Sequence, residues 1–325
     1  MGSFPGFIAA LTMQPIISLI LCTHNPRWEY LSCVITALKN QTLPTQQWEL
    51  LVVDNASDQP LASRLDLSWH PTATILREEQ LGLTHARLCG FRAANANLIV
   101  FVDDDNVLEQ NYLTHVVQIF KEHPELGAIA GKSLPKFEVE PEPWIKQYHS
   151  VLALRDFGET PLTTAGNFGA LTAESYPFFA PCGAGMALRK SLFATYTAQV
   201  ARNPVRLALG RSGQQLTSGE DNDMILTLLT AGWGVGYFPQ LQLTHLIAAH
   251  RLQPDYLARL NYAASRSWVQ VLGIHGIQPW KKIPAWTVSL RQMKAALCYQ
   301  PWRNAAAYIQ WRGACGTFAG QSILP

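Results

Sequence analysis

Short apolar runs alternate with helical patterns over the first 130 residues of the chain. Continuous apolar runs predict strands buried on both faces at 16–22, 48–53, 73–76, 98–102 and 127–130. Between these runs, apolar residues recur at helical spacing and predict helices at 27–40, 84–96 and 109–122. Strand–helix alternation at this spacing predicts an α/β fold with a parallel sheet and right-handed crossovers.

Polar residues follow three of these strands at the point where each strand ends. They are Thr23 and His24, the run Asp54 to Asp58, and the triplet Asp103 to Asp105. Ligands of parallel α/β sheets bind beyond the carboxyl ends of the strands, and all three groups fall on that edge. The sequence therefore predicts a ligand site there.

The pattern changes in the second part of the chain. The stretch 135–181 is rich in proline, glycine and aromatic residues and has little periodicity, which suits loops and short strands around an acceptor pocket. A helix is predicted at 221–230, followed by short strands at 234–238 and 241–246.

Composition excludes several classes of protein. With 325 residues and 48% hydrophobic residues, the chain is not disordered, and a net charge of +2 excludes a generally basic nucleic-acid binder. The charge is uneven, because residues 256–325 contain no Asp or Glu and eight Lys or Arg. Six cysteines without a CxxC pair indicate reduced thiols, and no secretory or membrane-spanning pattern is evident. We expect a cytoplasmic protein, either soluble or attached to a surface.

The adjacent carboxylates Asp103, Asp104 and Asp105 are the strongest local signal. Two unit charges 4 Å apart repel by about 4 kcal/mol at an effective dielectric constant of 20, so a positive partner is expected. A divalent cation with oxygen ligands, Mg²⁺ or Mn²⁺, would meet that need. The alternative is a solvated acidic turn or helix cap ahead of Glu109.

Three weaker signals each have a structural alternative. The acidic residues at 220–223 precede a helix, where capping and the helix dipole also favour them. Gly183 and Gly185 allow close backbone approach to a ligand, or form an ordinary tight turn. His245 is a metal-ligand candidate only if the other features meet it in space.

Six segments in order resemble family 2 of the inverting glycosyltransferases, over roughly residues 15–250. They are a first strand ending in Thr-His-Asn, then VVDNASD at 52–58, GLTHARLCG at 82–90, FVDDDN at 101–106, CGAGMALRK at 182–190 and GEDNDM at 219–224. The resemblance implies the GT-A fold, a Rossmann-like, mostly parallel sheet flanked by helices. We expect a catalytic domain at 1–255, with a nucleotide-binding half at about 15–132 and an acceptor half at about 133–255, and a basic, Trp-rich helical extension at 256–325.

The resemblance also assigns roles to single residues. Nucleotide binding falls to Thr23, Asn25, Asp54, Arg87, Asp103 and Asp104. The residues that would bind the metal are Asp105 and Asp103, which form the DxD motif, and His245. Gly183, Ala184, Gly185 and Met186 would support the donor sugar and the acceptor, and Asp221 would be the general base with Glu220 assisting.

The implied reaction is transfer of a sugar from a nucleotide-diphosphate donor, a UDP-sugar by family habit, to a glycan or lipid-linked acceptor. Direct displacement needs one base and a stabilised leaving group, and a bound metal ion would stabilise the leaving group. One alternative is a non-catalytic member that binds sugar nucleotide or membrane. Another is a sugar nucleotidylyltransferase, which the missing Gly-rich triphosphate loop after the first strand disfavours.

The segment 278–325 lies outside the resemblance. It interleaves four tryptophans with six Lys or Arg residues, a pattern that suits the inner face of an anionic membrane. The alternative, favoured by the weak amphipathic period, is that these tryptophans pack the segment onto the catalytic domain. Such a pattern also suits single-stranded nucleic acid, but nothing else in the chain supports that partner.

Overall fold

One mixed sheet of nine strands organises the computed structural model, which describes residues 14–164 and 171–324. The strand order is β3-β2-β1-β4-β8-β6-β9-β5, and β7 pairs with β9. The strands are β1 Ile17–Thr23, β2 Trp48–Asn55, β3 Thr74–Glu78, β4 Leu98–Asp103, β5 Asn106–Leu108, β6 Leu126–Phe137, β7 Leu162–Thr163, β8 Ala187–Arg189 and β9 Gly234–Ile247.

The first four strands form the parallel half of the sheet, as the apolar runs predict. β1 lies between β2 and β4, and β3 pairs with β2, all in parallel. The helices of this half, α1 Trp28–Lys39, α2 Leu83–Ala93 and α3 Tyr112–Glu122, coincide with the predicted helices to within three residues. The strongest sequence periodicities therefore correspond to the part of the fold that carries the ligand edge.

The second half of the sheet departs from a purely parallel arrangement. β8 runs antiparallel to both β4 and β6, and so separates the fifth predicted strand from the first four. β6 and β9 are long parallel partners, and β9 merges the two short strands predicted at 234–238 and 241–246. Three residues are too few for β8 to show a hydrophobic period, which explains why sequence reasoning missed it.

Helices cover both faces of the sheet at its centre, which is why β1, β2 and β4 are largely apolar and buried. On β1, Leu19 and Leu21 pack with α1 and α3 in one core cluster. Ile20 and Cys22 point to the opposite face, where they pack with α2, α4 Lys190–Val200 and α6 Glu220–Thr230. Alternate side chains of a strand face opposite sides of the sheet, so β1 contributes to both cores.

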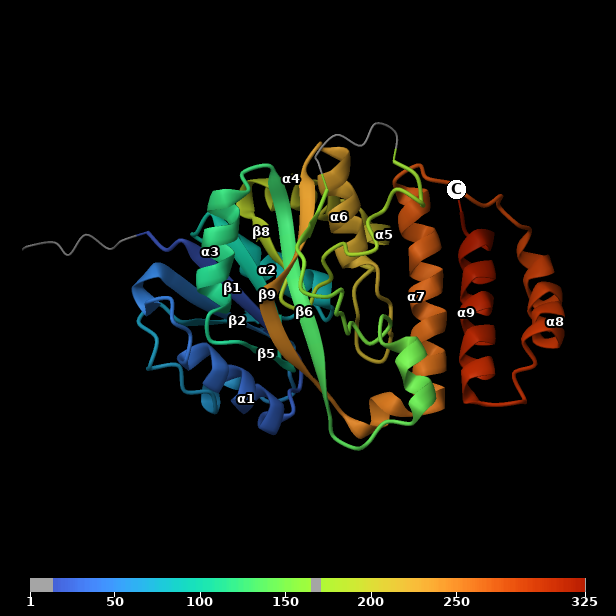
Figure 1. Cartoon of the computed structure of the whole chain (residues 1–325), viewed down its shortest axis with the longest axis horizontal. Coiled ribbons are helices and arrows are strands. Elements are labelled where there is room, and N and C mark those ends of the chain that lie inside the picture. Colours follow the sequence, from blue (N-terminus) through green and yellow to red (C-terminus); the bar gives the residue numbers. More distant parts are fainter. Residues whose placement is uncertain (1–13, 165–170, 325) are drawn as a thin grey trace, which may run out of the picture.

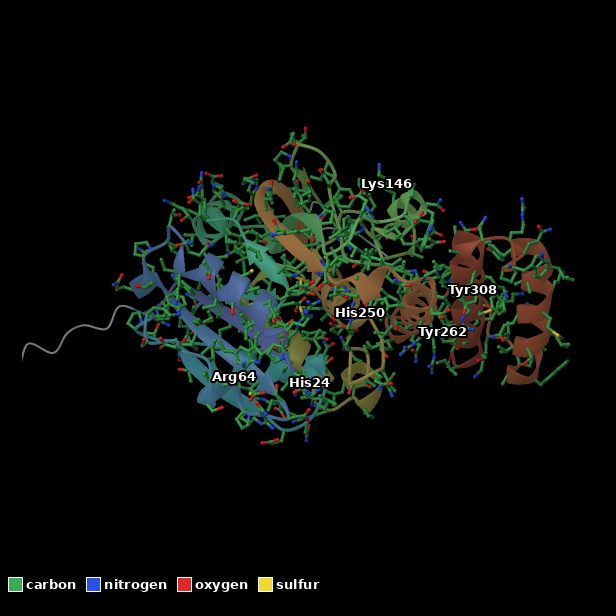
Figure 2. The ribbon with its side chains drawn as sticks, turned by 90° about the horizontal axis from the view of Figure 1, so that it is seen from below. His24, Arg64, Lys146, His250, Tyr262 and Tyr308 are labelled. Carbon is green, nitrogen blue, oxygen red and sulfur yellow. The ribbon has the colours of Figure 1, made fainter. Side chains whose placement is uncertain are left out.

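Three helices at the C-terminal end stand beside the sheet domain in the order α7, α9, α8 (Figure 1). They are α7 Pro254–Ile274, α8 Val288–Tyr299 and α9 Ala305–Ser322; the short α5, Pro204–Leu207, precedes α6. α9 packs against α7, and α8 packs against α9. Figure 2 labels Tyr262 on α7 and Tyr308 on α9, with α8 beyond them at the edge of the molecule.

The four tryptophans of segment 278–325 divide between the two arrangements considered for it. Trp280 packs on a core cluster with α7, and Trp311 on α9 donates its Nε1–H to the Gln292 carbonyl at 3.0 Å. Trp286 and Trp302, by contrast, are 76% and 67% exposed. Packing therefore accounts for two of the four. In the described part of the chain, no helix combines the length and apolarity needed to cross a bilayer.

Candidate active site

A pocket opens at the carboxyl ends of β1, β2 and β4, where the sequence predicts a ligand site. Thr23, Asn55 and Asp103 bring the strand ends into its wall, and Asp104 and Asp105 continue from β4. The N-terminal turn of α6 contributes Glu220 and Asp221, and His245 on β9 completes the acidic side. Figure 2 labels His24, which follows β1 and also lines this pocket. The fold thus gathers segments more than 200 residues apart in the chain.

Each carboxylate of the triplet has its own partner. The Thr23 hydroxyl donates to Asp104, and the Arg87 guanidinium lies 3.7 Å from Asp103 Oδ1. Asp105 Oδ2 lies 2.8 Å from Arg251 Nη1 and 3.2 Å from His245 Nε2. The positive partners that the triplet's self-repulsion requires are thus Arg87 and Arg251 of the chain itself.

Burial and neighbouring charges shift the three carboxyl groups in different directions. Burial raises the pKa of Asp103, and the Arg87 charge opposes this rise. Burial and the charge of Asp105 raise the pKa of Asp104 to about 7. Burial also disfavours ionised Asp105, but His245 and Arg251 outweigh it and hold its pKa well below the usual range. Of the three carboxyl groups, Asp105 is therefore the one whose neighbours favour the ionised form most strongly.

A buried ion pair joins α2 to α6 at the base of the pocket. Arg87 Nη1 lies 3.1 Å from Glu220 Oε1, and both side chains are less than a tenth exposed. A Cβ atom at Gly183 would lie 2.3 Å from Arg87 Nη2, so any larger residue at this position would clash with the guanidinium. Burial raises the pKa of Glu220 to about 7, and Arg87 opposes that rise.

Three acidic residues in the first turn of α6 have three different surroundings. Glu220 pairs with Arg87, whereas Asp223 is fully buried between Arg206 and His275, at 2.8 Å from each. Asp221 alone combines partial exposure with a place in the pocket wall, and its Oδ2 accepts from the Gly183 N–H at 3.1 Å. That hydrogen bond fixes the carboxylate and leaves it lone pairs for a ligand.

The donors at Asp105 and His245 fit a divalent cation that is shared with a ligand. Asp105 Oδ2 and His245 Nε2 converge on one point, and Mg²⁺-type ions are commonly bound by one or two protein groups plus phosphates and waters. Among the described residues no three His, Cys, Asp or Glu side chains gather as a metal cluster, so a closed protein cage is not formed. Arg251 Nη1 lies against both donors, at 2.8 and 3.2 Å, and would have to move aside for a cation.

Two residues expected at the nucleotide, Asn25 and Asp54, are not among the residues that line the pocket. Asp54 is 1% exposed, and its carboxylate accepts from the backbone of Ser57 and Leu61 and from Arg77. Asn25 exchanges two hydrogen bonds with Asp58. Both side chains therefore shape the loops after β1 and β2, while Thr23 and Arg87 line the pocket itself.

Of the glycine-rich segment, only Gly183 lines the pocket. Ala184 and Met186 are buried in the two core clusters. Gly185 adopts φ +71° and its carbonyl accepts from the Tyr112 hydroxyl at 2.5 Å. The close approach that these glycines permit is to Arg87 and Tyr112, side chains of the protein itself.

Several pocket residues carried no signal in the sequence. They include Arg211, Ser218 and Arg251, whereas His24 and Asn55 belong to the polar strand ends that the sequence predicts at this edge. Arg211 lies in a loop and Arg251 in the short 3-10 helix Ala249–Leu252 after β9, and only the folded chain brings them to the carboxylates. A requirement for positive charge near Asp105 was the one available hint, and it does not identify which arginines meet it.

Comparison with known proteins places this architecture in a family. Residues 18–196 match the family model described as glycosyl transferase family 2. A glycosyltransferase of Haloferax volcanii, AglE, is 28% identical over 102 residues, which cover 30% of this chain and 33% of AglE. The glucosyl-dolichyl phosphate glucuronosyltransferase of the same organism is 22% identical over 149 residues, 44% of this chain and 47% of that protein. The chain thus spans less than half the length of either relative.

Among solved structures, TarS of S. aureus (residues 1–349, in complex with UDP) superimposes with a TM-score of 0.52 at 13% identity. The match covers 93% of this chain and 89% of the TarS chain. At this identity the likeness concerns the fold, a GT-A-type α/β sheet with flanking helices. Because the family model matches more than half of the chain, the chain belongs to family 2 of the glycosyltransferases.

Proposed function

We propose that the protein transfers a sugar from a nucleoside-diphosphate donor to a hydroxyl group of a glycan or lipid-linked acceptor, with inversion at the anomeric carbon. One observation carries the proposal: Asp221 and the triplet Asp103 to Asp105 line the same pocket from opposite elements, α6 and β4. A base on one side and a charge-stabilising group on the other are what direct displacement requires.

The donor would bind along the strand edge. Thr23, Asn55 and Asp103 offer hydrogen bonds to nucleoside and ribose, and Arg211 and Arg251 offer positive charge to a diphosphate. Asp54 and Asn25 would act indirectly, by holding the loops that shape this subsite. The UDP in the TarS complex makes uracil the first base to test.

Asp105 and His245 would hold a divalent cation, Mn²⁺ or Mg²⁺, that supplies Lewis-acid stabilisation to the departing diphosphate. Arg251 would then leave Asp105, which frees its guanidinium to bind phosphate oxygens. Arg87, held by Glu220, adds fixed positive charge close to Asp103. These residues together would offset the negative charge that develops on the leaving group.

Asp221 would be the general base. Its carboxylate takes the proton of the acceptor hydroxyl, the hydroxyl oxygen bonds to the anomeric carbon, and the bond from that carbon to the diphosphate oxygen breaks. An α-linked donor then gives a β-linked product. The Gly183 N–H would orient the carboxylate during this step, and Glu220 would act as a positioning residue through Arg87.

The relatives suggest only the chemical class of the acceptor. One of them is named for a reaction of glucosyl-dolichyl phosphate, a lipid-linked sugar, which makes polyprenyl-phosphate sugars suitable first acceptors beside free glycans.

Replacement of the base tests the proposal. Asp221→Asn keeps the size of the side chain and can keep one of its two accepted hydrogen bonds, from Gly183 N–H or from Asn222 N–H, so the affinity for the nucleoside diphosphate should stay within about threefold. Release of that diphosphate from the sugar donor with acceptor present should fall by about 10²–10⁴-fold, the usual contribution of a general base. The matched control is Asp255→Asn, at an exposed aspartate in the first turn of α7. Turnover within tenfold of the wild-type rate would contradict the assignment.

A further inference from the structure

An apolar stripe runs along the outward side of α8. Trp286 just before the helix, then Leu290, Met293 and Leu297, follow one another at intervals of four, three and four residues. Their side chains are 76%, 54%, 59% and 71% exposed. Residues at this spacing lie on one face of a helix, so the stripe is continuous rather than scattered.

The stripe is not part of the packing between α8 and α9. The residue of α8 that is buried is Ala295, about half a turn around the helix from Leu297, and the Gln292 carbonyl accepts from Trp311 of α9. α8 is the outermost helix of the molecule, with α9 between it and α7 (Figure 1). The apolar stripe therefore faces away from the body of the protein.

Positive charge borders this stripe. On α8, Lys294 borders the stripe and Arg291 lies one turn before Lys294 on the same flank, farther from the stripe. Lys281 and Lys282 precede the helix and Arg303 follows it, and all five side chains are exposed. No Asp or Glu occurs from residue 256 to the end of the chain, so α8 and α9 carry no acidic residue, and Asp255 in the first turn of α7 is the one acid of the three helices. Trp302, 67% exposed in the turn between α8 and α9, adds a second indole.

We propose that the outward face of α8 docks on the surface of a membrane that contains anionic phospholipid. Apolar side chains of an interfacial helix enter the headgroup–acyl boundary, indoles sit at headgroup level, and Lys and Arg bind lipid phosphates. A second copy of the chain is a poorer occupant, because a symmetric contact would bring Arg291 and Lys294 against their own counterparts. The docking is independent of the transfer reaction and of its metal.

Co-sedimentation of the full chain with vesicles tests the proposal. The probes are vesicles of phosphatidylcholine alone and of phosphatidylcholine with 30% phosphatidylglycerol. The apolar variant is Leu290→Gln with Leu297→Gln, and the charge variant is Arg291→Gln with Lys294→Gln. Matched controls are Val139→Gln, an exposed aliphatic residue after β6, and Lys121→Gln with Arg202→Gln, exposed basic residues elsewhere.

The wild-type chain and the controls should bind the anionic vesicles and bind the neutral ones weakly. Each basic side chain near an anionic surface contributes about fivefold in binding, so the charge variant should lose about 30-fold. The apolar variant should lose at least tenfold, with unchanged circular dichroism. Equal binding of wild type and both variants would overturn the proposal. A wild-type dimer that the apolar variant converts to monomer, without vesicle binding, would assign the face to a second copy instead.

Discussion

Removal of Arg87 is the perturbation with the clearest consequence for both fold and site. Its side chain is 3% exposed and is held between Glu220, at 3.1 Å, and Asp103, at 3.7 Å. Arg87→Met keeps most of the side-chain volume but takes away the charge. Glu220 then stays buried at the N-terminal turn of α6 without its cation, and Asp103 also loses its partner.

The size of the effect follows from this burial. Breaking a buried ion pair by removing one partner costs about 3–5 kcal/mol, because the remaining charge stays desolvated. Unfolding entropy near 2.1 cal/mol/K per residue, summed over 325 residues, converts this loss to a decrease in Tm of about 4–7 °C. An exposed pair of the same geometry would contribute less than about 1 kcal/mol.

The loss should also depend on pH. Burial raises the pKa of Glu220 from 4.5 to about 7 although Arg87 opposes the rise. A raised folded-state pKa means that the contribution to stability is present below pH 4.5 and is lost as the pH passes through 7. Without Arg87 the pKa of Glu220 rises further, so the deficit of the variant should grow from pH 6 to pH 8, by at most about 1.4 kcal/mol per pH unit.

Urea unfolding at pH 6 and pH 8 measures both effects, and the double variant with Glu220→Gln is the control. The double variant lacks both charges, so its loss of unfolding free energy should be smaller than the sum of the losses of the two single variants. The extra pH dependence should disappear. A loss under 1 kcal/mol for Arg87→Met, or strict additivity in the double variant, would refute the reasoning.

Two further predictions concern the neighbouring groups. Arg251→Gln removes a cation 2.8 Å from Asp105, so the affinity of the nucleotide-free protein for Mn²⁺ should rise severalfold, measured by titration calorimetry; an unchanged or lower affinity would show that Arg251 does not compete with the metal. Gly185→Ala places a Cβ 2.6 Å from the Tyr112 hydroxyl at φ +71°, and should cost about 2–4 kcal/mol in urea unfolding. Gly158→Ala, at φ +89° with nothing within 4 Å, carries only the backbone strain and should cost about 1 kcal/mol; equal losses for both glycines would rule out the steric argument.

Sequence reasoning works well where the signal is local. The strands β1, β2 and β4 are continuous apolar runs because helices cover both faces of the sheet, and each ends in polar residues at the ligand edge. The triplet Asp103 to Asp105 is predicted from its position at a strand end and from the self-repulsion of adjacent carboxylates, whereas Asp221 is predicted from the family resemblance. Their meeting in one pocket follows from the parallel topology.

What the sequence does not predict depends on contacts between distant segments. β8 is three residues long and enters the sheet because β4 and β6 leave an antiparallel position between them. Arg251 has no distinguishing pattern in the sequence. It joins the site because the short 3-10 helix after β9 places its guanidinium 2.8 Å from Asp105. The apolar stripe of α8 becomes evident only once α9 shows which side of the helix is covered.

The central claim is that the pocket binds a nucleoside diphosphate through a cation on Asp105. Calorimetric titration of the protein with UDP, GDP, CDP and dTDP, each with Mn²⁺ and with EDTA, measures this directly, and Asp105→Ala is the comparison. We predict that one nucleotide binds in Mn²⁺, at least tenfold more weakly in EDTA, and that Asp105→Ala abolishes the Mn²⁺-dependent part. If none of the four binds under either condition, or if Asp105→Ala binds as tightly as the wild type in Mn²⁺, the claim is contradicted.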